Sequence, residues 1–364
     1  MNWTEQQSNA LKAVEEWFYS KDRKQIFRVF GYAGVGKTSL AKSFAETIDG
    51  DVLFAAFTGK AALVLRKNGC RGATTLHSLI YKAVEQEDGT VEFIHNDDSP
   101  LYGAELLIVD ECSMVDEDLA KDILAFRKPV LVLGDPAQLP PIAGAGYFTN
   151  AEPDVMLTEI HRQAKDNPII YLATRVRRGL SLELGDYDEC KIVSKIASSA
   201  LAEHEQVIVG KNDTRQQLNR RIRKMMNFED ELPYKGDRII CLRNDKMKGI
   251  YNGGMFNVVK RIPNSRYPEW PTYQVNDIDN PQNRGLIVKV HNAFFTGDKK
   301  PDWKYLKGTQ EFDFGYAITC HKSQGSQWDN ILVFDESYCF RDDSNRWLYT
   351  AITRAQNRLT VYKK

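Results

Sequence analysis

The strongest constraint on the fold is the glycine-rich segment Gly31-Tyr32-Ala33-Gly34-Val35-Gly36-Lys37-Thr38. An apolar run, Ile26 to Phe30, precedes it, and a stretch compatible with a helix, Ser39 to Ile48, follows it. The glycines therefore lie where a buried strand turns sharply into a helix, which is the context that a phosphate-binding loop (P-loop) requires. Backbone N–H groups of such a loop surround a polyphosphate, and the helix N-terminus adds partial positive charge. The segment predicts an α/β fold and nucleotide binding.

Individual positions of the loop predict contacts to the nucleotide. Lys37 is expected to reach the outer phosphates, and Thr38 to offer its hydroxyl to Mg²⁺. The other cofactor-binding positions predicted here are Gly34, Gly36 and Ser39. Ahead of the loop, Gln7 could read adenine, because one amide carries both a donor and an acceptor; a solvated helix glutamine is the alternative.

Composition bounds the class of protein. The 364 residues suffice for two or three domains, and 49 basic against 49 acidic side chains leave no overall basic field. The six cysteines have no disulfide-framework or zinc-ligand spacing, so we expect reduced thiols in a cytoplasmic protein. No run approaches membrane-spanning length and the start lacks a signal pattern, which predicts no membrane partner.

Two further apolar strands end in polar side chains. The run from Glu105 to Val109 leads into Asp110 and Glu111, and carboxylates at the carboxyl end of a core strand lie where α/β sheets bind ligands. The first acid is expected in the Mg²⁺ shell and the second beside the attacking water. A later strand, 129–133, leads into a proline-fixed loop that holds Gln138, whose amide can bond a γ-phosphate.

Other segments have both a structural and a nucleic-acid-binding interpretation, or predict further β structure. Thr58 with Lys60, and Thr75 with His77, stand at probable helix starts, which indicates either capping alone or a grip on the phosphates of a strand. Arg175, Arg177 and Arg178 would cover a solvated helix face or touch a phosphate backbone. Residues 84–94 contain Asp88-Gly89 and predict a β-hairpin, and 234–310 read as a small all-β barrel inserted into a second α/β unit.

The order of these pieces resembles the superfamily 1 helicases, and within them the RecD-like and Dda-like branch, which moves 5′-to-3′ on single-stranded DNA. The resemblance covers almost the whole chain. Its motifs stand here as Thr4-Glu5-Gln6-Gln7, the P-loop, Phe57-Thr58-Gly59-Lys60-Ala61, Thr74-Thr75-Leu76-His77, Asp110-Glu111-Cys112-Ser113, Gly134-Asp135-Pro136-Ala137-Gln138-Leu139-Pro140-Pro141, Glu159-Ile160-His161-Arg162, Thr319-Cys320-His321-Lys322-Ser323-Gln324-Gly325 and Tyr349-Thr350-Ala351-Ile352-Thr353-Arg354.

The resemblance implies two RecA-like P-loop NTPase lobes with ATP between them and DNA across their tops. The first lobe would span 1–160, with a duplex-splitting pin at about 82–102. The second would combine 161–233 with 311–364, around an inserted SH3-like β subdomain at 234–310. Substrates would be single-stranded DNA and its junctions with duplex, the cofactors ATP and Mg²⁺, the state a monomer, and a single-strand-binding protein a candidate partner.

The resemblance also implies roles for single residues. Lys37, Glu111 and Gln138 would serve hydrolysis as phosphate ligand, base and γ-phosphate sensor, and Asp110 would join Thr38 at Mg²⁺. The residues that would contact nucleotide from the second lobe are the arginine fingers Arg162 and Arg354, and Gly325. Those on the DNA track would be Thr58, Lys60, Thr75, His77, Thr319, His321 and Lys322, with Phe93 as a wedge on the pin. Core packing is the alternative for Phe93.

This chain departs from the family at Gln327, where many members carry an acidic residue near the ribose. An RNA helicase of the viral superfamily 1 type remains an alternative, since a grip on the backbone carries little information about the sugar. A nucleotide-dependent switch that binds nucleic acid without unwinding is an alternative from a different class. The compact size favours a phage source.

Overall fold

A computed structural model describes residues 3–85, 91–140, 146–159, 166–245, 248–278, 280, 283–299, 301–302, 305–306 and 308–363, without the side chains of 83, 85 and 91–93. The chain forms two compact units. Unit 1 is Met1–Leu182 with Phe340–Thr353, and unit 2 is Glu183–Cys339 with Arg354–Lys364. The lobe boundary predicted above at 160/161 stays a prediction.

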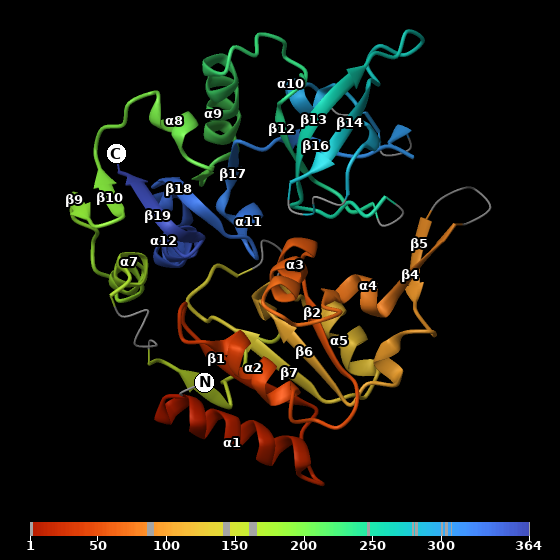
Figure 1. Cartoon of the computed structure of the whole chain (residues 1–364), viewed down its shortest axis with the longest axis vertical. Helices are drawn as coiled ribbons and strands as arrows, with labels where there is room; N and C mark the ends of the chain where they lie inside the picture. The colour runs from red at the N-terminus through yellow and green to blue at the C-terminus, as the bar shows by residue number, and fades with distance from the viewer. Residues whose placement is uncertain are drawn as a thin grey trace. The chain divides into compact units, whose positions relative to one another are not determined.

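Unit 1 is built on a six-stranded sheet in which every pairing is parallel (Figure 1). The strand order is β3-β2-β6-β7-β1-β8. The strands are β1 (Ile26–Gly31), β2 (Val52–Ala56), β3 (Thr74–Thr75), β6 (Leu106–Asp110), β7 (Val130–Gly134) and β8 (Val155–Leu157). Its helices are α1 (Glu5–Tyr19), α2 (Lys37–Ala45), α3 (Gly59–Lys67), α4 (Leu76–Ile80), α5 (Glu117–Ala125), α7 (Pro168–Arg177) and α12 (Ser344–Ile352).

Helices cover both faces of this sheet, as the alternation along β6 shows. Leu106 and Ile108 belong to the apolar cluster that includes α1, α2 and α3, whereas Leu107 and Val109 belong to the cluster that includes α4 and α5. A strand buried on both faces reads as a continuous apolar run, which is why β6 and β7 could be predicted. The loops after β1, β6 and β7 consequently meet at the carboxyl edge of the sheet, where α/β proteins bind ligands.

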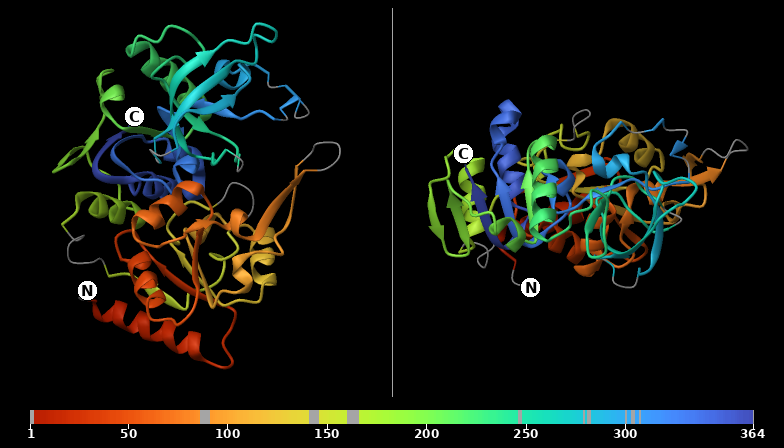
Figure 2. Two further views of the ribbon diagram at one scale, coloured as in Figure 1. Left: turned by 45° about the vertical axis from the view of Figure 1, so that its right-hand side comes forward. Right: turned by 90° about the horizontal axis from the view of Figure 1, so that it is seen from above.

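The expected hairpin is present as β4 (Tyr81–Glu85) and β5 (Val91–His95), paired antiparallel from Tyr81↔His95 to Glu85↔Val91. Its Asp88-Gly89 turn lies outside the described residues. At the hairpin base, Tyr81 donates a hydrogen bond to Asp122 of α5, and Nε2 of His95 lies 3.3 Å from the same carboxylate. The paired strands extend away from the body of unit 1 (Figure 2).

Unit 2 contains a second six-stranded sheet, in the order β17-β11-β18-β19-β10-β9, parallel except for β9 against β10. Its strands are β9 (Gly185–Tyr187), β10 (Cys190–Val193), β11 (Gln206–Val209), β17 (Ala317–Thr319), β18 (Trp328–Phe334) and β19 (Ala355–Tyr362). Three helices accompany it: α8 (Ala200–Glu203), α9 (Asn212–Met225) and α11 (Cys320–Ser323). The sequence pattern did not predict β9 or β10.

Inserted between α9 and β17 is a five-stranded antiparallel sheet in the order β15-β14-β13-β12-β16. Its elements are β12 (Arg238–Cys241), β13 (Met255–Ile262), β14 (Thr272–Asp277), β15 (Leu286–Lys289), α10 (Ala293–Thr296) and β16 (Phe312–Phe314). The expectation that 312–317 resumes the α/β unit is wrong for β16, which pairs with β12 because Phe312 and Phe314 point into the inserted core. One apolar cluster joins both sheets of unit 2.

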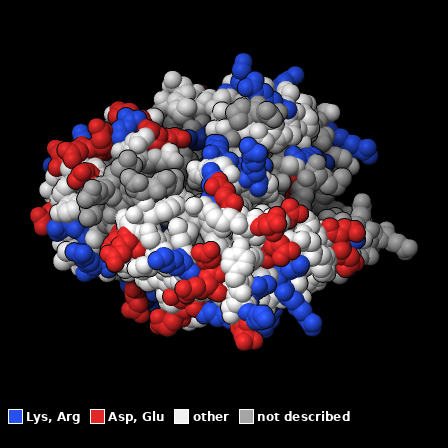
Figure 3. All heavy atoms as spheres, turned by 60° about the horizontal axis from the view of Figure 1, so that its bottom comes forward, with Lys and Arg blue, Asp and Glu red and all other residues white. Residues whose placement is uncertain are grey.

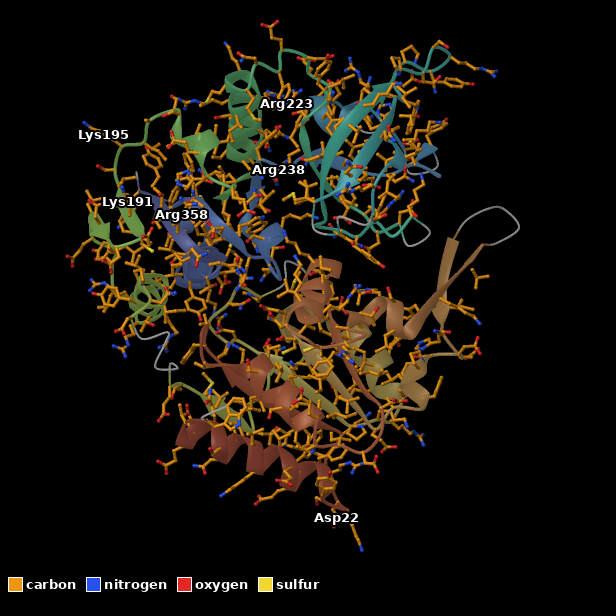
Figure 4. The ribbon with its side chains drawn as sticks, viewed as in Figure 1. Asp22, Lys191, Lys195, Arg223, Arg238 and Arg358 are labelled. Atoms are coloured by element: carbon orange, nitrogen blue, oxygen red, sulfur yellow. The ribbon has the colours of Figure 1, made fainter. Side chains whose placement is uncertain are left out.

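A buried polar network holds the chain where it enters and leaves the inserted sheet. Arg223 of α9 binds Asp237 through two bonds of 2.9 Å, and Tyr316 donates to the same carboxylate at 3.0 Å. The side chains of Arg223 and Asp237 are 5% and 0% exposed. Figure 4 marks Arg223 and its neighbour Arg238 beside this junction. Since every acceptor is satisfied, the network fixes the inserted sheet to α9.

Surface charge on the face in Figure 3 is mixed, with Lys and Arg interspersed among Asp and Glu, as the zero net charge predicts. All six cysteines are free thiols, and only Cys339 is exposed. Over the described part of the chain, no helix has both the length and the apolar character needed to cross a membrane.

Candidate active site

The P-loop connects β1 to α2 through two glycines with left-handed backbone, Gly34 at φ 79° and Gly36 at φ 82°. Residues that have a side chain rarely adopt this backbone conformation, so glycine is favoured at both positions. At Gly31 the reason is space, because a Cβ there would lie 2.8 Å from the carbonyl oxygen of Leu157. The sequence therefore forms the tight, close-packed loop that the motif predicts.

Lys37 is held inside the loop. Its Nζ donates to the carbonyl oxygens of Gly31 at 2.7 Å and Tyr32 at 3.1 Å. These carbonyls hold the ammonium group over the first residues of the loop, within reach of a phosphate that the loop's N–H groups would bind.

Thr38, Asp110 and Glu111 come together where α2 begins and β6 ends. Thr38 Oγ1 donates to Asp110 Oδ2 at 2.7 Å, and the Glu111 N–H donates to Asp110 Oδ1 at 2.8 Å. Desolvation, and then the charge of Glu111, raises the pKa of Asp110. Glu111 itself has left-handed backbone, φ 52° and ψ 46°, an uncommon conformation for this residue type that occurs often at functional sites.

These groups fit a magnesium ion. A threonine hydroxyl and a carboxylate are oxygen ligands of the kind that Mg²⁺ uses beside substrate phosphates. Asp110 is desolvated and lies near the negative charge of Glu111, and both effects raise its pKa. A cation bound here would offset both effects. Among the described residues, no three His, Cys, Asp or Glu side chains form a group that could hold a metal ion.

The loop after β7 faces the same edge and carries Asp135 and Gln138. Asp135 is 3% exposed, and desolvation raises its pKa; its carboxylate accepts hydrogen bonds from the Ala137 N–H at 3.0 Å and from the Tyr349 hydroxyl at 2.6 Å. Gln138 is 8% exposed, and its Oε1 has no hydrogen-bond partner in the described part of the molecule. A buried acceptor without a partner is costly, which favours a ligand or a water at this atom.

Helix α12 connects the two loops of unit 1. Besides donating to Asp135, the Tyr349 hydroxyl accepts the N–H of Ala33 in the P-loop at 2.9 Å. Thr350 accepts the N–H of Leu139 at 2.9 Å. The motif around Tyr349 was recognised in the sequence, but this contact was not, because it joins residues 316 positions apart.

Gln7 lies at the loop, and both ends of its amide form hydrogen bonds within the protein. Its Oε1 accepts the Thr4 N–H at 3.0 Å in a capping box of α1, and its Nε2 donates to the carbonyl oxygen of Val35 at 3.0 Å. The structure thus gives Gln7 a structural role in supporting the P-loop. Adenine reading by Gln7 stays a prediction.

Arg177, at the end of α7, also lies at the P-loop. The guanidinium carbon of Arg177 is 3.5 Å from the centre of the Tyr32 ring, and Arg177 Nε is buried without a hydrogen-bond partner in the described part of the chain. Its charge also lowers the pKa of Tyr349, although burial raises that pKa more strongly. Sequence reasoning did not assign Arg177 to this site.

The polar residues predicted at the DNA track of unit 1 lie at helix starts. Thr58 caps α3, accepting the Ala61 N–H at 3.1 Å, and Thr75 caps α4, accepting the Ser78 N–H at 3.1 Å. The two caps are neighbours, because β2 and β3 pair with Ala56 opposite Thr75. Lys60 is only 8% exposed, and the His77 ring packs 5.6 Å from Phe57.

In unit 2, the predicted residues cluster around α11 and the start of β19. Thr319 precedes α11, and Lys322 donates to Asn252 Oδ1 at 3.0 Å. Gly325 has φ 72°, and Arg354, 3% exposed, donates to the carbonyl oxygen of Ser326 at 3.4 Å. His321 lies on α11.

Two predicted residues cannot be placed. Arg162 lies outside the described residues, as does the side chain of Phe93, whose backbone belongs to β5. Their roles stay predictions.

Comparisons with known proteins bear on the family and the fold of the chain. Residues 3–198 match the AAA domain family, and residues 314–362 match the UvrD-like helicase C-terminal domain. The ATP-dependent RecD2 DNA helicase of Deinococcus radiodurans is 31% identical over 90% of this chain and 45% of its own length. The ATP-dependent DNA helicase dda of phage T4 is 31% identical over 48% of this chain and 43% of its own length. This chain thus spans less than half of either relative.

Solved structures show the same fold. A Pif1 helicase from a study of DNA unwinding at forked duplexes covers 99% of this chain and 92% of that chain, with a TM-score of 0.61 and 20% identity. Bacteroides Pif1 bound to single-stranded DNA has a TM-score of 0.59, 21% identity, and the same coverage of both chains. The fold is therefore that of two RecA-like lobes. The chain belongs to the AAA domain family, and it is similar to helicases of the RecD-like and Dda-like type.

Proposed function

We propose that this chain is an ATP-dependent DNA helicase that hydrolyses ATP to move 5′-to-3′ on single-stranded DNA and to unwind duplex. The observation that carries the proposal is the convergence of Lys37, Thr38, Asp110, Glu111 and Gln138 at one edge of the sheet of unit 1. Relatives named as ATP-dependent DNA helicases, and Pif1 structures with single-stranded DNA, support the choice of reaction.

Each residue at this edge has a part in the proposed hydrolysis. Lys37 leaves the carbonyls of the loop to bind the outer phosphates, and Mg²⁺ held through Thr38 and Asp110 would neutralise charge on the phosphate oxygens. Glu111 takes the proton of the attacking water. Gln138 uses its free Oε1 to orient that water.

Arg162 and Arg354 are proposed to supply positive charge to the transition state. Fingers delivered from a second lobe make hydrolysis depend on lobe closure, so that each turnover is tied to a step along the strand. Gly325 would contact the same nucleotide, and Gln7 its base.

The DNA track is proposed to run past the helix starts of α3, α4 and α11. Thr58 and Thr75 use their side chains as caps, so the remaining N–H groups of these helix starts would bind phosphates. The other proposed contacts are Lys60, His77, Thr319, His321 and Lys322. Such contacts to the backbone carry no sequence preference.

The hairpin β4–β5 is proposed as the pin that splits duplex, with Phe93 as a candidate wedge, and the inserted sheet as an SH3-like subdomain. A hairpin that separates two DNA strands must keep its position while the duplex is pulled against it. Asp122 would hold the hairpin in place, because it contacts Tyr81 of one strand and His95 of the other. Asp122→Ala should therefore lower unwinding while single-stranded DNA still stimulates the ATPase. Asp118→Ala, at an exposed position of the same helix, is the matched control.

The main test measures ATP hydrolysis with and without oligo-dT, and unwinding of duplexes that bear a 5′ or a 3′ tail. Lys37→Ala and Glu111→Gln should abolish hydrolysis, while Glu105→Gln, at an exposed acid just before β6, should not. If Glu111→Gln turned over ATP at the unmutated rate, the proposed chemistry would be wrong. Equal stimulation by oligo-U and oligo-dT would contradict the preference for DNA.

The remaining expectations are proposals of the same kind. We propose a cytoplasmic monomer that acts at junctions of single- and double-stranded DNA, with a single-strand-binding protein as a partner. Sedimentation with and without DNA would test the monomeric state.

A further inference from the structure

Arg177 presents a positive charge to the P-loop, and no acidic side chain among the described residues forms an ion pair with it. Its guanidinium stacks on the ring of Tyr32, with 3.5 Å between its central carbon and the ring centre. Its Nε is buried, and within the described parts of the chain none of its nitrogens forms a hydrogen bond or an ion pair. A buried N–H without an acceptor is unfavourable, so the position of Nε indicates a role for Arg177 other than stability of the nucleotide-free protein.

Tyr32, on which Arg177 stacks, also contacts the P-loop lysine. The carbonyl oxygen of Tyr32 accepts the Lys37 ammonium at 3.1 Å, and the N–H of the next residue, Ala33, is held by Tyr349. Lys37 and Arg177 therefore meet the same residue of the loop, one through its backbone and the other through its ring. Two cations on one residue of an anion-binding loop indicate that both serve the anion.

The chemistry of the guanidinium fits this reading. Stacking uses the flat face of the group and leaves the N–H groups along its edge free to donate, which is the arrangement arginine uses with phosphates. Lys37 is a point charge, whereas Arg177 could donate two parallel bonds to oxygens of one phosphate. Tyr32 would act as the platform that fixes the plane of this fork.

We propose that Arg177 binds the terminal phosphate of the ATP held by the P-loop, in addition to the two arginine fingers assigned above. This inference rests on the proposed function, since it names a further contact to the same nucleotide. It predicts selectivity between nucleotides: the contact exists with a triphosphate and is missing with a diphosphate.

The experiment measures binding of the non-hydrolysable β,γ-imido analogue of ATP and of ADP, both with Mg²⁺, by isothermal titration calorimetry on the full chain. Arg177→Gln should weaken the analogue by about 10-fold or more and leave ADP within about twofold, because a charge-assisted bond to one phosphate is lost. Arg178→Gln, one residue further along and exposed, is the matched control and should change neither. Arg177→Lys should lie between, since it keeps the charge without the fork.

The outcomes are separable. If the unmutated protein binds neither nucleotide, the proposed function fails. If it binds both and Arg177→Gln weakens the two equally, or weakens the analogue by less than about twofold, the inference about Arg177 is overturned. If Arg177→Gln does not fold, Arg177→Lys carries the test, and unchanged selectivity in that variant overturns the inference.

Discussion

The junction of the inserted sheet gives the sharpest prediction for stability. Replacing Arg223 by Met keeps most of the side chain's volume but leaves Asp237, which is 0% exposed, without its two 2.9 Å bonds to a guanidinium. The Tyr316 hydroxyl and the Tyr234 N–H still donate to that carboxylate, so it is not wholly unpaired. Removing one member of a buried ion pair typically costs about 3–5 kcal/mol, and we expect the lower end of that range.

Urea unfolding followed by circular dichroism, with linear extrapolation, gives the free energy for unit 2. Arg358→Met is the control, because Arg358 and Asp329 form a 3.1 Å pair in which both side chains are about half exposed, and it should lose nothing measurable. Arg223→Met with Asp237→Asn should lose less than the sum of the single variants, since no charge is left buried. A loss below about 1 kcal/mol for Arg223→Met, or an additive double variant, would refute the reasoning.

Three further predictions concern the edge of the sheet in unit 1. Tyr349→Phe removes the donor to Asp135 and the acceptor of a P-loop N–H, and should lower stability by about 1.5–3 kcal/mol in thermal unfolding, with a lower ATPase rate; an unchanged melting temperature would contradict it. Gln138→Leu removes a buried acceptor that has no partner among the described residues, so melting should be unchanged or higher, while ATP turnover falls about 10²-fold. The raised pKa of Asp110 means that the folded protein binds its proton more tightly than the unfolded chain, so the charged form destabilises the fold at neutral pH. Asp110→Asn should therefore melt higher than the unmutated protein at about pH 8, and the difference should shrink towards about pH 5; a constant difference would count against it.

Much of unit 1 was predictable because its signals are local. The P-loop, the strand before Asp110 and the strand before Gln138 each combine an apolar run with a turn of defined chemistry, and parallel pairing then brings their ends together. The left-handed backbone of Glu111 could not be predicted, because no rule of sequence requires a glutamate there to adopt it.

The parts of the site that the sequence did not predict depend on contacts between residues far apart in the chain. Tyr349 and Arg177 reach the P-loop from α12 and α7, and a side chain's partner far along the chain leaves no periodic trace. Strand β16, in contrast, has a periodic pattern in the sequence. Phe312 and Phe314 alternate with Asp313, as in a half-buried antiparallel strand, whereas the next strand begins with the continuous apolar pair Ala317 and Ile318. The break therefore falls at Gly315, not before 312.

The chain passes between its two units three times, after Leu182, after Cys339 and after Thr353. A fragment ending at Leu182 would thus lack α12, whose Tyr349 and Thr350 accept hydrogen bonds from the loops of the first sheet. Unit 1 of a fragment 1–182 should therefore regain its native packing only when the fragment 183–364 is added, which makes this protein suited to fragment complementation.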